Sequence, residues 1–101
     1  MTVDRLLNEV KNYLDITISD EATDQKVNGM IERGKNYLCG LAGCSLDFNA
    51  PAQPKALLLD YCRYARSNAL EMFAVNFRSE LIGLKIQKEV DAYANSSTRP
   101  L

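Results

Sequence analysis

The cysteines are the first residues in this sequence whose types and spacing could do chemistry. Cys39 and Cys44 have four residues between them, and Cys62 follows at a distance. A structural zinc site needs four ligands, usually cysteine and histidine, whereas this chain has three cysteines and no histidine. The missing histidine also removes the commonest general base and the Ser-His and Cys-His nucleophile pairs. We therefore predict no metal ion, no cofactor, and a Cys62 that packs as a small hydrophobic residue.

The carboxylates and glycines offer no catalytic arrangement either. Asp60, Glu71 and Glu80 are expected on helices as solvated or ion-paired groups, and Asp60 can pair with Arg63 three residues later. The glycines are scattered along the chain and match neither the P-loop nor the dinucleotide-binding pattern. The sequence therefore predicts that the protein is not an enzyme.

A third group mixes aromatic rings with cations, as single-stranded nucleic-acid sites do. Its members are Tyr61, Arg63, Tyr64 and Arg66. In a helix these side chains spread around the axis instead of lining one side. The net charge of the chain is -1, so it has no large basic excess to attract phosphates. A small nucleic-acid-binding protein, either a regulator or a DNA-packaging recognition subunit, stays as the alternative function.

These residues belong to a stretch, Pro54–Phe77, that the sequence predicts as one long central helix. It has no glycine and no proline after Pro54, and it is rich in good helix formers. Helical spacing turns one apolar face toward the core: Leu58, Tyr61, Cys62, Ala65, Ala69 and Met72. A second line is predicted to contact a neighbouring subunit: Leu59, Arg66, Leu70, Phe73 and Phe77. The alternative is that the C-terminal segment folds back and covers this line within one chain.

Three further stretches have helical patterns. The first covers residues 2–15, and the second covers residues 20–41, where Gly34 is expected to mark the close approach of another helix backbone. The third stretch, residues 78–93, is predicted as a helix. The alternative for this stretch is a short strand, because apolar residues alternate at Ile82, Leu84 and Ile86.

The resulting fold class is all-α, a small bundle of three to four helices with one long central helix and a flexible C-terminal tail. A chain of 101 residues fits one domain. We place that helical domain at residues 1–94 and the polar tail at residues 95–101. No apolar stretch approaches the roughly 20 residues that a membrane-spanning helix needs. We therefore expect a soluble protein without a membrane partner.

The order of these pieces resembles the small head-tail connector, or adaptor, proteins of tailed bacteriophages and prophages. The likeness rests on an opening helix (LLNEVKNYL), a helix of the type IERGKNYL, a loop containing LDFN, and the run LLLDYCRYARSNALEMFAVNF. It covers residues 3–90 loosely and is most specific over residues 31–38 and 57–77.

The resemblance implies a non-enzymatic structural protein of the virion, made in the bacterial host cytoplasm and located at the head-tail junction. Its copies, commonly twelve, would form a homo-oligomeric ring beneath the portal protein. The ring would extend the DNA channel toward a stopper or tail-completion protein, and DNA would pass through without specific binding. The resemblance also implies a portal-contacting tail, formed here by Asn95, Ser96, Ser97, Thr98, Arg99, Pro100 and Leu101.

Overall fold

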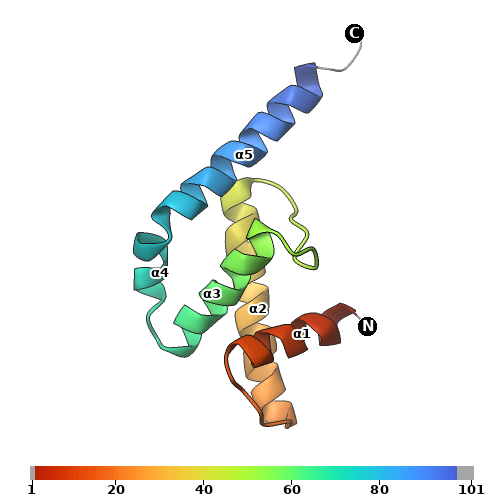
Figure 1. The fold of residues 1–101 in the computed structure, drawn as a ribbon, viewed down its shortest axis with the longest axis vertical. Coiled ribbons are helices and arrows are strands. Elements are labelled where there is room, and N and C mark those ends of the chain that lie inside the picture. The colour runs from red at the N-terminus through yellow and green to blue at the C-terminus, as the bar shows by residue number, and fades with distance from the viewer. Residues whose placement is uncertain (1, 98–101) are drawn as a thin grey trace.

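The computed structural model describes the backbone of residues 2–97 and the side chains of residues 5–91. Within that range every regular element is a helix, which confirms the all-α part of the predicted fold class (Figure 1). There are five helices in the described part, more than the three to four predicted: α1 (Thr2–Tyr13), α2 (Glu21–Ala42), α3 (Gln53–Arg66), α4 (Leu70–Asn76) and α5 (Arg78–Ser97).

The start of α2 follows from local chemistry. Asp20 has extended backbone angles, and its side chain accepts a hydrogen bond from the backbone N–H of Thr23 at 2.7 Å. This is an N-cap, and the acidic residues Glu21 and Asp24 in the first turn interact favourably with the helix dipole. At the other end Gly43 adopts a left-handed φ of 74° and closes the helix. The observed helix begins and ends within one residue of the predicted range 20–41.

Gly34 lies where α2 and α3 pack together, so the prediction of a neighbouring helix is right, but side chains of that helix and not its backbone approach the glycine. A methyl group built at Gly34 would lie 2.6 Å from Leu58 Cδ1 and 2.9 Å from Tyr61 Cδ1. The contact is thus made by α3 side chains, which occupy the space that any larger residue would need. Gly34, Leu58 and Tyr61 are all buried.

The predicted long helix over 54–77 is wrong, because the chain leaves the helix after Arg66 and starts α4 at Leu70. Asn68 adopts a left-handed φ of 54°. Its N–H donates to the Ala65 carbonyl at 3.1 Å, and the N–H of Ala69 donates to the Tyr64 carbonyl at 2.9 Å. This pair of bonds is a Schellman motif, which satisfies the last carbonyls of a helix.

Asn68 can take this position in the break because asparagine tolerates the left-handed region better than most residues with a side chain. It also changes which side chains face inward: Met72, predicted on the core face of the long helix, is exposed. The same motif ends α1, where Asp15 has a φ of 57° and Ile16 N–H donates to the Lys11 carbonyl at 2.8 Å.

Substitutions of Asn68 test whether the turn between α3 and α4 is left-handed. Replacing Asn68 with alanine is expected to lower the free energy of unfolding by about 0.5 to 1 kcal/mol, because alanine is strained at positive φ. Replacing Asn68 with glycine is expected to raise it by a few tenths of a kcal/mol. Urea denaturation followed by circular dichroism measures both changes.

The matched control is Asn8→Gly on the exposed face of α1, where φ is not positive. Glycine there is expected to destabilise the protein by a few tenths of a kcal/mol. If glycine had the same sign of effect at both positions, the left-handed turn at Asn68 would be incorrect.

The core is built around Phe73, which is 1% exposed. Its ring centroid lies 5.5 Å from that of Tyr61, 5.8 Å from that of Tyr64 and 5.0 Å from that of Phe77. Tyr37 of α2 approaches the same ring edge-on at 6.2 Å. Aromatic pairs at these separations attract one another beyond simple area burial. The turn at Asn68 therefore lets α4 place an aromatic side chain against α2 and α3.

The C-terminal helix packs against α2 and α4 through Leu81 and Leu84, both of which are buried. Residues 78–93 are thus helical, as predicted, and the strand alternative is wrong. The helix continues to Ser97, so the backbone of 95–97, placed in the predicted tail, belongs to α5. Residues 98–101 of that tail lie outside the described residues. The distal half of α5 projects from the other four helices along the longest axis of the molecule (Figure 1).

Candidate subunit interface

Intrachain packing covers much of the line of residues predicted to contact another subunit. Phe73 is in the core, and Leu59 and Phe77 are partly buried against it. Leu70 is 37% exposed, and Arg66 is exposed while its guanidinium donates a hydrogen bond to the Leu14 carbonyl. The break at Asn68 divides the line between α3 and α4. Leu70 and Arg66 are the members that offer most surface to a partner.

The residues predicted to contact a portal protein cannot be placed on a surface. The backbone of Asn95, Ser96 and Ser97 forms the last turn of α5, but their side chains lie outside the described residues. Thr98, Arg99, Pro100 and Leu101 lie wholly outside the described residues. Their contact with a portal stays a prediction.

A different apolar surface, which the sequence did not single out as an interface, lies on α5. Ile82, Ile86 and Val90 recur every fourth residue and are 46% to 54% exposed. At about 100° per residue their mean direction points nearly opposite to that of Leu81 and Leu84, which face the core. We call these three exposed residues the α5 stripe. The sequence signal for this surface is the alternation of apolar residues at 82, 84 and 86, which was the ground for the strand alternative.

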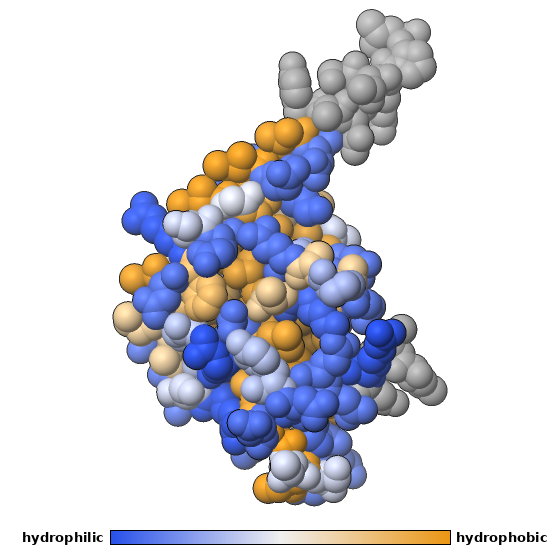
Figure 2. Space-filling view, viewed as in Figure 1, coloured by the Kyte–Doolittle hydropathy of each residue, from blue (hydrophilic) through white to orange (hydrophobic). Residues whose placement is uncertain are grey.

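Exposed apolar side chains continue on the neighbouring short helix. Three of them lie on α4: Leu70, Met72 and Val75. Figure 2 shows hydrophobic residues along the outer edge of α5 and again at α4. Single exposed apolar residues are ordinary, but a row of them on a helix whose other face is buried is typical of an interaction surface.

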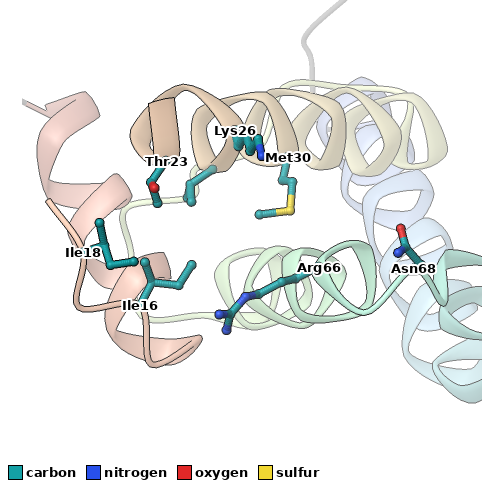
Figure 3. A pocket seen from close by; sticks show the side chains of 8 residues that line it. Ile16, Ile18, Thr23, Lys26, Met30, Arg66 and Asn68 are labelled. Atoms are coloured by element: carbon teal, nitrogen blue, oxygen red, sulfur yellow. The ribbon is translucent and has the colours of Figure 1, made fainter. Parts of the chain in front are cut away.

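A concave surface lies on another part of the molecule, between α2, the end of α3 and the segment that joins α1 to α2 (Figure 3). Its volume is about 480 Å³, within the range of ordinary ligand pockets. We call it the linker groove. Apolar and polar side chains line it together: Ile16, Ile18, Thr23, Lys26, Val27, Met30, Arg66 and Asn68. Arg66, predicted as an interface residue, is one of its two cations.

Ion pairs hold the helices around the linker groove. Lys11 is buried, and its ammonium pairs with the Asp24 carboxylate at 2.7 Å, which ties α1 to α2. On α3, Asp60 accepts a hydrogen bond from the hydroxyl of Tyr13 in α1 and forms an ion pair with Arg63. The hydrogen bond to Asp60, followed by burial, raises the pKa of Tyr13, so this hydroxyl keeps its proton at neutral pH. These contacts tie α1 to α2 and to α3, the two helices that help to form the groove.

The three thiols differ in their surroundings. Cys62 is fully buried, as predicted, and burial raises the pKa of its thiol to about 12. A thiol with that pKa is protonated and unreactive at neutral pH. Cys39 is partly buried and Cys44 is exposed. Within residues 5–91 no group of three or more potential metal-ligating side chains comes together.

None of the helices in the described part of the chain combines the length and hydropathy needed to cross a membrane. Comparisons of the whole chain with protein-family models, with curated proteins and with solved structures give no match.

Proposed function

We propose that this protein is a structural subunit of the head-tail junction of a tailed bacteriophage or prophage. Its copies form a ring beneath the portal protein and extend the DNA channel toward the tail. The proposal combines the resemblance of residues 3–90 to connector proteins with the surface properties of the folded chain. It assigns the protein no catalytic role.

One observation supports the assembly part of this proposal. α5 carries buried residues on one face, Leu81 and Leu84, and the exposed α5 stripe on the other. A helix that serves only its own domain usually has an apolar stripe on the core side and polar residues elsewhere. The second apolar face is therefore suited to contact with another chain.

The size of the stripe suggests what kind of contact it makes. Covering the exposed halves of three aliphatic side chains would contribute about 2 to 4 kcal/mol. Association of two free proteins costs an estimated 4 to 15 kcal/mol or more in lost freedom, so such a contact alone is weak. In a ring, each copy makes two such contacts, and a template raises the effective concentration of neighbours. The stripe thus fits an assembly that is completed on a partner.

The mass of a portal ring, measured with and without this protein, tests the proposal. The gene for this chain is expected to lie downstream of portal, protease and capsid genes and upstream of tail-completion genes. The portal protein encoded there, mixed with this protein, is expected to gain mass in whole multiples of 11.3 kDa, with twelve copies bound per portal ring. A portal ring whose mass is unchanged would overturn the proposal. A shift of duplex DNA that weakens with salt would instead support the nucleic-acid-binding alternative.

A further inference from the structure

Two of the three cysteines are brought together by the way α2 ends. Cys39 lies in the last turn of the helix, and Gly43 closes it with a left-handed φ of 74°. The backbone N–H groups of Gly43 and Cys44 both donate to the Cys39 carbonyl, at 2.8 and 3.3 Å. The second bond spans six residues, as in a Schellman motif, where the side chains of the first and sixth residues commonly make contact. Here those two residues are Cys39 and Cys44.

The hydrogen bond between the two residues limits how far apart they can be. The path from the Cα of Cys39 through its carbonyl oxygen to the N and Cα of Cys44 holds the two Cα atoms within about 7 Å. In an unbroken helix, residues five apart would be separated by about 9 Å. Disulfides join residues whose Cα atoms are about 4.4 to 6.8 Å apart. The left-handed turn at Gly43 therefore brings the two thiols into the range of a disulfide.

The two thiols also differ in their access to solvent. Cys44 is exposed and lines a surface hollow together with three residues of α5: Lys85, Lys88 and Glu89. Exposed cysteines near cationic side chains are the ones that oxidants reach most readily. Cys39 is partly buried against the core. It is thus shielded from solvent but next to Cys44, which is the arrangement of a resolving cysteine.

We infer that Cys39 and Cys44 form an intramolecular disulfide when the protein is exposed to a peroxide. The Cys44 thiolate attacks one oxygen of hydrogen peroxide, the O–O bond breaks, and Cys44 becomes a sulfenic acid while hydroxide leaves. The Cys39 thiolate then attacks the Cys44 sulfur, which forms the S–S bond and releases the sulfenic oxygen as a second hydroxide. The two hydroxides take up the two thiol protons. The pair of thiols is thus oxidised, and the peroxide is reduced to two molecules of water.

This modification site is independent of the proposed function, because it follows from the end of α2 alone. The disulfide connects the last turn of α2 to the start of the segment that leads to α3. Reducing thiols such as glutathione break it again by thiol–disulfide exchange, so its state follows the redox conditions around the protein. Cys62 is fully buried and takes no part.

Mass spectrometry of the folded protein after treatment with hydrogen peroxide tests the site. No lysine or arginine lies between residues 36 and 54, so trypsin releases Cys39 and Cys44 in one peptide and Cys62 in another. The first peptide is expected to lose about 2 Da, the mass of two hydrogen atoms, and to regain it with a reductant. Cys62→Ala is expected to show the same loss. Cys44→Ser, a change at an exposed position, is expected to abolish it.

Three results would overturn the pairing. They are a peptide of unchanged mass, a dimer joined through Cys44, and a gain of about 32 or 48 Da, which marks a sulfinic or sulfonic acid that no second thiol intercepted.

Equilibration with reduced and oxidised glutathione separates pairing by the fold from mere closeness in sequence. The equilibrium constant for forming the disulfide is expected to be about tenfold or more higher in the native protein than in concentrated urea, because the end of α2 holds the thiols together. Equal constants in the two conditions would show that the fold does not orient this pair.

Discussion

Alanine in place of Phe73 is expected to lower the free energy of unfolding by about 3 to 5 kcal/mol. The ring is 1% exposed and contacts Tyr37, Tyr61, Tyr64 and Phe77. Its removal leaves a cavity and also removes the aromatic contacts that join α4 to α2 and α3. Because domains of this size are stable by about 5 to 15 kcal/mol, the variant is expected to unfold at much lower urea concentration.

Val75→Ala is the matched control for Phe73→Ala, because both residues lie on α4 and Val75 is 64% exposed. Its effect on stability is expected to stay within about 0.5 kcal/mol. The two variants also separate the two interpretations of Phe73. A core residue loses stability on truncation, whereas a residue that only contacts another subunit would cost less than about 1 kcal/mol in the monomer.

The second large effect is expected at Gly34. A methyl group there meets Leu58 and Tyr61 at less than 3.0 Å, and both residues are buried in the α2–α3 contact. Overpacking of this kind costs about 1 to 3 kcal/mol, and the better helix propensity of alanine returns up to about 1 kcal/mol. Gly34→Ala is therefore expected to destabilise the protein by about 1 to 2 kcal/mol net, measured by urea denaturation.

Gly40 provides the same substitution on the same helix without the steric conflict. Nothing lies within 4 Å of a methyl group built there. Gly40→Ala is thus expected to stabilise the protein by about 0.5 kcal/mol, reduced from the mid-helix value because the position is close to the end of α2. A stabilising effect at both positions would show that α3 does not pack against Gly34.

Local signals in the sequence predicted much of the helical structure. The apolar spacing of the sequence placed α2 within one residue of its observed ends, where the structure has the N-cap Asp20 and the left-handed Gly43. Gly34 was recognised as a packing position because an interior glycine is costly in a helix unless something fills its space. These features depend on neighbouring residues in the chain, which is why the sequence reveals them.

The break between α3 and α4 could not be predicted in the same way. Ser67 and Asn68 are only moderately poor helix formers, and no glycine or proline marks the turn. The left-handed turn at Asn68 accompanies the packing of Phe73 against Tyr61 and Tyr64, which is a tertiary contact. Tertiary packing of this kind overrides weak local preference.

The location of the candidate interface also depends on tertiary packing, which the sequence does not reveal. The sequence indicates a surplus of apolar surface but places it on the stretch 54–77, because it predicts one unbroken helix there. Once the chain turns at Asn68, Phe73 enters the core, and the clearest exposed apolar row is the α5 stripe. Which of two apolar faces a helix buries depends on its neighbours, and periodicity alone does not supply them.

The most direct test of the α5 stripe as a contact between copies is sedimentation equilibrium of the wild type and of the double variant Ile82→Glu/Ile86→Glu. Because a contact of this size is weak, we predict that the average mass of the wild type rises above 11.3 kDa only at high, roughly millimolar, concentration. The variant is expected to stay at 11.3 kDa with an unchanged helical signal, because both positions are exposed. A wild type that stays at the mass of one chain at every concentration, or a variant that associates as strongly as the wild type, would contradict this role.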